Sequence, residues 1–65
     1  MAGKADFQIH LFPPGSMTNV AIAVIERDTS NAALRLADEV LKTGWSAEVW
    51  SHDALDYFGR VSRKG

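Results

Sequence analysis

Three consecutive residues, Ser51, His52 and Asp53, have the side-chain types of a hydrolase triad. In such a site the hydroxyl, the imidazole and the carboxylate converge in space, so that the histidine can take the serine proton while the carboxylate orients the ring. Neighbouring side chains of an extended segment point apart, and these three are therefore not expected to converge. The chain has no cysteine, which also excludes a thiolate nucleophile and a disulfide framework.

Metal and phosphate sites are not indicated either. The two histidines, His10 and His52, have no partner at the spacing of a known metal-ligand motif. The proline- and glycine-containing residues 13–16 lack the spacing and the lysine of a phosphate-binding loop. A chain of 65 residues also leaves little room for a pocket that buries a substrate. We therefore expect a protein that is not an enzyme and that uses no metal or cofactor.

The main candidate for binding is Trp50. Residues 45–50 alternate so that Trp45 and Trp50 lie on opposite faces of a strand, and if one face covers the core, the other tryptophan is at least partly exposed. Exposed aromatic side chains are favoured anchors of protein interfaces. The alternative is that a C-terminal hairpin covers both rings. The leading hypothesis is a protein-binding inhibitor or adaptor whose contact residues are Trp50, Glu48, Asp53, Asp56, Glu26 and Asp28.

A second hypothesis concerns the C-terminal segment, which combines aromatic and basic residues. Aromatic rings can stack on bases while cations hold phosphates, so this segment could bind nucleic acid. Three cations are few for that purpose, because useful affinity requires many phosphate contacts, and a solvated C-terminus is the plainer interpretation. The residues concerned are Tyr57, Phe58, Arg60, Arg63 and Lys64.

Length, composition and charge restrict the class of protein. Sixty-five residues make one domain, and an apolar fraction of 46% is ordinary for a globular chain. The net charge of −1 divides into −4 for residues 26–56 and +3 for residues 57–65, which is too modest to name a partner. No apolar run approaches the roughly 20 residues of a membrane span. A cytoplasmic monomer or small homodimer is expected.

One amphipathic helix organises the chain. Over residues 30–43 the apolar side chains recur at helical spacing and form one stripe, which is expected to be buried. Asp28, Thr29 and Ser30 are candidate N-caps, and Gly44 is the expected terminator. The stripe consists of Ala33, Leu34, Leu36, Ala37, Val40 and Leu41.

Strands are predicted on both sides of this helix. Residues 5–11 alternate as a half-buried strand, and the turn-forming residues 13–16 end it. Residues 20–25 are apolar on both faces, which predicts a central strand covered on both sides. Residues 45–50 alternate again, and a strand, helix and strand in succession favour a parallel relation between the two strands if they join one sheet.

Residues 53–62 fit either a helix or a strand. A hairpin is preferred because the aromatic pair and Val61 favour a strand, with Leu55, Tyr57, Gly59 and Val61 on one face. The predicted fold is a single α+β domain in the order β-β-α-β-β, with one helix packed on a mostly antiparallel sheet, and with residues 1–4 frayed.

The helix followed by Gly44, the aromatic strand 45–50 and the segment 53–63 with the core Tyr57-Phe58-Gly59-Arg60-Val61 resembles small phage-borne α/β proteins of the anti-CRISPR type. The resemblance is one of size and pattern over about half of the chain. It implies a compact surface that blocks a host nucleoprotein complex by presenting acids in place of nucleic acid. The low net charge argues against strong mimicry of DNA.

Overall fold

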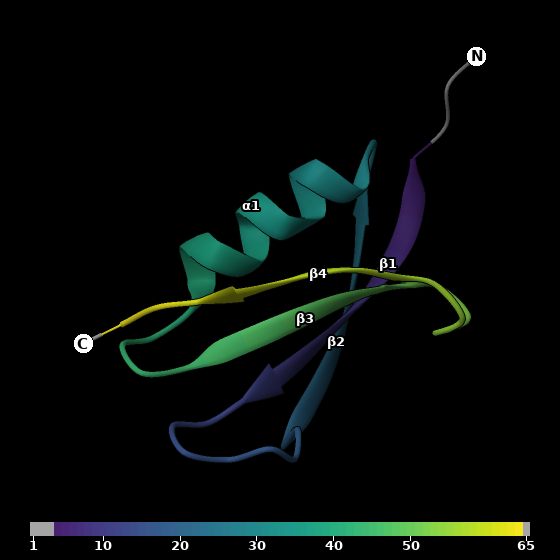
Figure 1. The fold of residues 1–65 in the computed structure, drawn as a ribbon. Coiled ribbons are helices and arrows are strands. Elements are labelled where there is room, and N and C mark those ends of the chain that lie inside the picture. The colour runs from purple at the N-terminus through teal and green to yellow at the C-terminus, as the bar shows by residue number, and fades with distance from the viewer. Residues whose placement is uncertain (1–3, 65) are drawn as a thin grey trace.

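The first predicted strand forms with its two faces alternating as expected, and it occupies an inner position in a four-stranded sheet. The computed structural model describes residues 4–64. They form β1 (Ala5–Phe12), β2 (Ala21–Arg27), α1 (Ser30–Val40), β3 (Ser46–Ser51) and β4 (Tyr57–Ser62) (Figure 1). The predicted α+β fold is confirmed. The predicted fraying of the N-terminus falls mostly on residues 1–3, which lie outside the described part; Lys4 is exposed and precedes β1.

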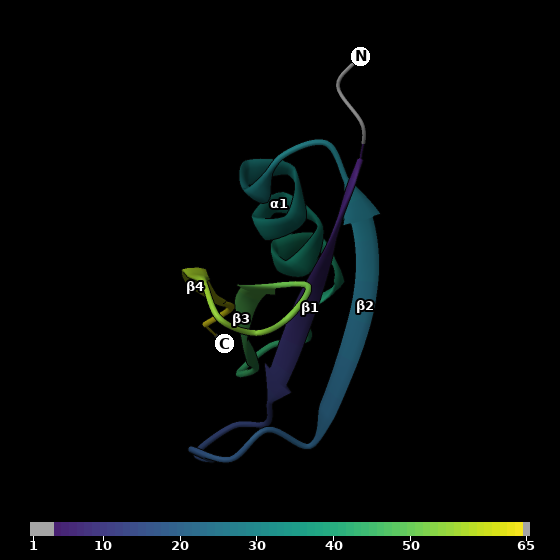
Figure 2. The same ribbon diagram turned by 90° about the vertical axis from the view of Figure 1, so that its right-hand side faces the viewer.

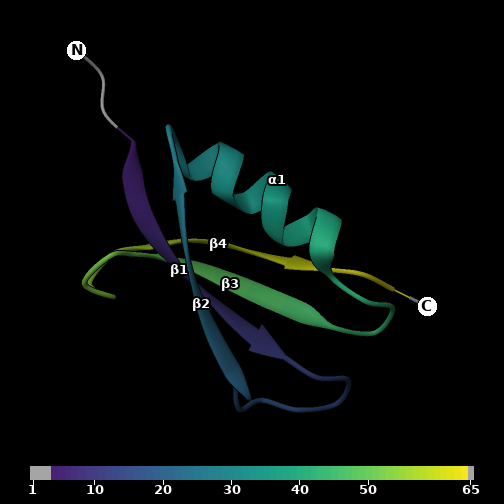
Figure 3. The same cartoon turned by 180° about the vertical axis from the view of Figure 1, so that it is seen from behind.

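The strands lie in the order β2-β1-β3-β4, and every neighbouring pair is antiparallel. Because β2 and β3 are both antiparallel to β1, they run in the same direction, and α1 connects them over one face of the sheet. The parallel relation predicted for these two strands is thus confirmed. The sheet is strongly twisted: in Figures 1 and 3 the β1–β2 hairpin runs steeply across β3 and β4, and its turn lies far from α1.

The predicted central position of residues 20–25 is wrong. β2 is an edge strand, and Val20, Ile22 and Val24 keep 62%, 54% and 61% of their surface exposed. The central place next to β2 is taken by β1, which pairs with β3 on its other side. An apolar strand of this kind was expected to be covered because burial is the commonest reason for such a composition. Here Val20, Ile22 and Val24 face solvent instead, and Ile25 packs partly buried against the core.

The core lies between α1 and the sheet. Its helix residues are mostly alanines, whose small side chains let the helix approach the strands closely. Thr29 is the N-cap, and its hydroxyl accepts a hydrogen bond from the Ala32 N–H at 3.1 Å, as one of the predicted candidates. The buried apolar side chains of this core are Phe7, Ile9, Ala33, Ala37, Leu41, Ala47 and Val49.

The C-terminal end of the helix differs from the prediction. α1 ends at Val40 rather than near Gly44, because Leu41 adopts an extended conformation with φ −68° and ψ 138°. This turn carries Leu41 into the core and leaves Val40 59% exposed, so the predicted burial of Val40 is wrong. Gly44 has φ +85° and belongs to the connection to β3.

No helix within residues 4–64 is long and apolar enough to cross a membrane.

The hairpin preferred for the C-terminal segment is confirmed over Tyr57–Ser62, but Leu55 lies in the turn before β4 and the side chain of Tyr57 points the other way. A bulge shifts the register so that Val49 pairs with Gly59 while Trp50 pairs with Tyr57. Tyr57 therefore leaves the face of Gly59 and joins that of Trp50. Gly59 has φ +156°, and a Cβ there would meet a Leu34 methyl carbon at 3.2 Å, so the missing side chain lets α1 lie close to β4.

Candidate functional site

The face of the sheet that α1 does not cover carries the aromatic, charged and polar side chains that could contact a partner. Phe7, Ile9, Ala47 and Val49 point toward α1, so the alternate residues of their strands point away. The register extends this assignment to β2 and β4. We call this surface the open face; it includes Asp6, Gln8, His10, Phe12, Ile22, Val24, Glu26, Ser46, Glu48, Trp50, Tyr57 and Arg60.

Aromatic rings form a row across the open face. The Trp50 ring lies 5.1 Å from the Tyr57 ring, centroid to centroid, and 5.9 Å from the His10 ring, on which it stacks with an interplanar angle of 27°. His10 pairs in register with Ile22 on β2. The row Tyr57, Trp50, His10, Ile22 thus takes one side chain from each strand, and its two ends are about half exposed.

Polar contacts hold this row in place. The Trp50 Nε1–H donates to a Glu48 carboxylate oxygen at 3.2 Å, and the other oxygen of that carboxylate accepts from Arg60 at 3.0 Å. The Arg60 guanidinium also donates to the Ser46 hydroxyl and lies 4.9 Å above the centre of the Phe12 ring, which it covers. The charge of Glu48 is therefore balanced within the face.

The other side of the row is fixed through β1. The Gln8 side-chain oxygen lies 3.0 Å from the His10 Nε2, and the Gln8 amide donates to the His52 carbonyl oxygen at 2.9 Å. The first contact requires His10 to carry a proton on Nε2. These bonds restrict the rotation of the imidazole on which Trp50 stacks.

Comparisons of the chain with models of protein families, with curated proteins and with solved structures found no match. Any function proposed for this face therefore depends on its geometry alone.

The residues predicted for partner binding are only partly brought together. Trp50 lies on the open face as expected, in hydrogen-bond contact with Glu48. Glu26 lies on the same face at the outer strand, where it pairs in register with Asp6. The others follow the ends of strands: Asp53 and Asp56 lie between β3 and β4, and Asp28 lies between β2 and α1.

The residues predicted for nucleic-acid binding are divided between the two faces. Tyr57 and Arg60 lie on the open face, whereas the Phe58 ring makes an edge-to-face contact with the buried Phe7 at 5.5 Å. Arg63 donates to a backbone carbonyl oxygen of α1. Lys64 is exposed. The arrangement does not form one stacking surface lined by free cations.

The Ser51-His52-Asp53 segment forms a turn. The Ser51 hydroxyl donates to the Asp53 carboxylate at 2.6 Å and accepts the backbone N–H groups of Leu55 and Asp56. The hydrogen bond from Ser51 is the main cause that lowers the pKa of Asp53, followed by the backbone N–H of Leu55. The serine hydroxyl donates to a carboxylate rather than to an imidazole, so this geometry stabilises a turn.

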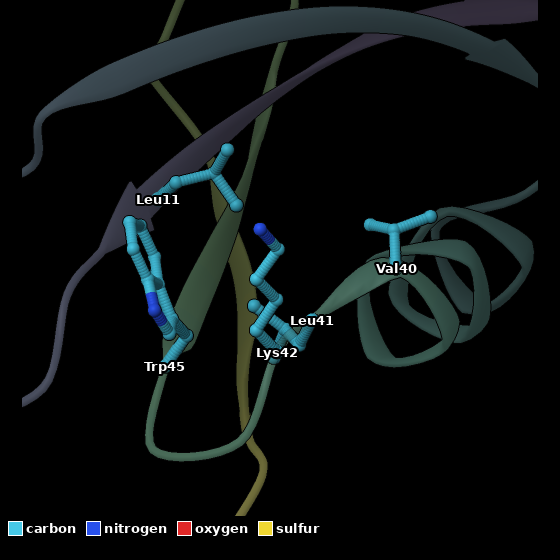
Figure 4. Close-up of a pocket in the computed structure, with 5 residues that line it drawn as sticks. All are labelled: Leu11, Val40, Leu41, Lys42 and Trp45. Carbon is cyan, nitrogen blue, oxygen red and sulfur yellow. The ribbon is translucent and has the colours of Figure 1, made fainter.

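On the helix side, a shallow apolar hollow of about 350 Å³ lies beside the end of α1 (Figure 4). Its lining includes Trp45, which is partly buried against the core, as the alternation predicted. The residues around it are Leu11, Val40, Leu41, Lys42 and Trp45. Within residues 4–64 no three histidine or acidic side chains lie close enough to hold a metal ion.

Sequence reasoning missed the contribution of β1 and β2 to this face. The sequence excludes His10 from a known metal-ligand motif but does not reveal its stacking on Trp50, because that contact depends on the pairing of β1 with β3. Ile22 and Val24 were assigned to a covered strand. The polar side of the alternation in residues 5–11 was the available signal for His10; nothing local distinguishes an edge strand from a central one.

Proposed function

We propose that this chain is a non-enzymatic protein-binding module and that its open face, centred on Trp50, is the contact surface. The observation that carries this proposal is the row of Tyr57, Trp50, His10 and Ile22 across all four strands. Apolar and aromatic surface left exposed on a small folded chain commonly marks an interaction site. Trp, Tyr and Arg are also the residue types that contribute most at protein interfaces.

The fixed geometry of the row supports binding to a protein surface. Trp50 is held by its hydrogen bond to Glu48, and His10 by its contact with Gln8. Side chains that are ordered before binding lose little conformational entropy when the complex forms. The face is therefore suited to a partner whose apolar groups can cover the rings while its polar groups meet the surrounding side chains.

Inhibition of a host nucleoprotein complex in the cytoplasm is one form of this function, and it rests on the resemblance to anti-CRISPR proteins alone. Presentation of acids would fall to Glu26, Asp28, Asp53 and Asp56, because Glu48 is already paired with Arg60. We assign these four acids to the rim of the contact surface. Rim charges affect the rate of association more than the stability of the complex.

The test is affinity capture from the native host, followed by binding measurements on the captured partner. Trp50→Ala should weaken the complex by more than about 2 kcal/mol, or roughly thirtyfold, as a central aromatic residue does. Leu55→Ala is the matched control, because Leu55 is 78% exposed but lies in the turn outside the row. Melting curves of both free variants establish that the fold is intact.

Equal affinity of the Trp50→Ala variant and the parent would refute the proposed contact surface. Loss of the captured partner after nuclease treatment, together with a steep fall of affinity with salt, would indicate the nucleic-acid alternative instead. In that case neutralising Arg63 and Lys64 should abolish binding, whereas the protein-binding proposal expects those two changes to have little effect.

A further inference from the structure

Over residues 21–25 the outer edge of β2 has none of the features that usually protect an exposed strand, because the charged residues of β2 lie at its C-terminal end. Residues 21–25 contain no charge and no proline, and the register with β1 runs without a bulge from Arg27 to Ala21. Within residues 4–64 no segment pairs with this edge, and Figure 2 shows it on the side of the sheet away from β3 and β4. The opposite edge, β4, carries a bulge and Arg60. Folded proteins normally block or pair an edge of the β2 kind.

We propose that the edge of β2 pairs with the same strand of a second copy of this chain, antiparallel and about a twofold axis at Ala23. An axis perpendicular to the sheet keeps both open faces on the same side and both helices on the other. The result is a continuous sheet across two copies. This surface is the backbone edge of β2, and its test needs no partner for the open face.

The sequence of β2 complements itself in this register. Ala23 meets Ala23 of the second copy, Ile22 meets Val24, and Ala21 meets Ile25, so every cross-strand pair from residue 21 to residue 25 is apolar. On the helix side, Ile25 of the second copy lies next to the small Ala21. Ala21 itself pairs with Leu11, which lines the hollow beside α1. The Ile25 side chain of the second copy would therefore extend the apolar surface around this hollow, which is open to solvent in the single chain.

Charge favours the antiparallel arrangement of two identical strands. Glu26 and Arg27, at the C-terminal end of β2, are the charged residues of this strand. Antiparallel pairing carries the two copies of Glu26 to opposite ends of the interface. Parallel pairing would place them side by side, and like charges in that position are unfavourable.

The dimer is expected to be weak. Five paired residues give an edge about 17 Å long and about 10 Å thick, or roughly 170 Å² in projection. A standard stable interface buries about 800 Å² on each partner. Association should therefore be visible at high protein concentration or after covalent trapping.

A disulfide between introduced cysteines can trap the dimer, and no other disulfide competes with it because the chain has no cysteine of its own. In the proposed register, Ala23→Cys brings two thiols onto directly opposed positions with Cα atoms about 4.5–5.5 Å apart, which permits a disulfide. Ala21→Cys is the matched control on the same strand and the same face. Its two Cα atoms are about four residues, or roughly 14 Å, apart along the strands and cannot be bridged. Under mild oxidation the first variant should form linked dimer at least tenfold faster than the second.

Charge variants provide an independent measurement by sedimentation. The double variant Ile22→Lys/Val24→Lys and its counterpart Ile22→Glu/Val24→Glu should each be monomeric, whereas an equimolar mixture should form heterodimers. All four substitutions are at exposed positions, and circular dichroism checks that the free chains are folded. Equal rates of oxidation for the two cysteine variants would overturn the proposal. So would a parent chain that remains monomeric at roughly 1 mM.

Discussion

Two valines on different strands test whether the distribution of burial is as described. Val49 on β3 is fully buried, whereas Val24 on β2 is 61% exposed. Truncation to alanine removes two methyl groups at each site, worth about 1.6 kcal/mol when fully buried. Val49→Ala also leaves a cavity, for a total of about 2–3 kcal/mol. For Val24→Ala the buried fraction scales the loss to about 0.6 kcal/mol.

Urea unfolding followed by circular dichroism measures both losses. A chain of 65 residues is expected to have a free energy of unfolding of roughly 3–10 kcal/mol, so the loss at Val49 should shift the midpoint clearly. The measurements belong at low protein concentration, where pairing of β2 between copies does not contribute. A loss at Val24 equal to or larger than the loss at Val49 would show that β2 is a covered strand and that the described strand order is wrong.

Three further predictions concern the helix and the turn. Val40→Gln should cost less than about 1 kcal/mol in a urea melt, whereas Ala37→Gln should cost more than about 2 kcal/mol, because it forces a polar side chain into the core. Thr29→Ala should cost about 1 kcal/mol through loss of the N-cap, and an unchanged midpoint would contradict that role. Because the hydrogen bond from Ser51 lowers the pKa of Asp53, the charged carboxylate stabilises the fold above the ordinary aspartate pKa and loses this effect as the pH falls through the lowered value. The melting temperatures of the parent and Asp53→Asn should therefore differ most near neutral pH and converge in acid.

Local patterns predicted the elements of this fold well, because each depends on residues close in sequence. The 3.6-residue spacing located α1, the alternation in residues 45–50 placed Trp45 and Trp50 on opposite faces, and the capping residue was among the candidates named. Ala37 is buried as predicted. These statements require only the periodicity of the chain.

Apart from the end of α1, the errors arose where the outcome depends on pairing between distant segments. The edge position of β2 follows from the pairing of β1 with β3, which no local pattern specifies. The reversal of Tyr57 follows from a bulge, which shifts the register by one residue. Val40 is exposed because α1 ends before Leu41. In the same way, the stacking of His10 on Trp50 could not be predicted before the strands were ordered.

The two proposed surfaces of β2 are compatible because a strand presents its side chains and its backbone edge in perpendicular directions. Ile22 points out of the open face, where it ends the aromatic row, whereas the outer edge of β2 consists of backbone groups that lie in the plane of the sheet. Pairing of two copies through that edge would place two open faces side by side in one surface. A partner with two matching sites would then bind more tightly than either face alone allows, through a higher effective concentration.

Comparing the parent with Ile22→Lys/Val24→Lys on such a partner would not isolate this effect, because both substitutions also alter the open face. The disulfide-linked Ala23→Cys dimer does isolate it, since Ala23 lies on the other face: its affinity should exceed that of the reduced chain for a two-site partner and equal it for a one-site partner.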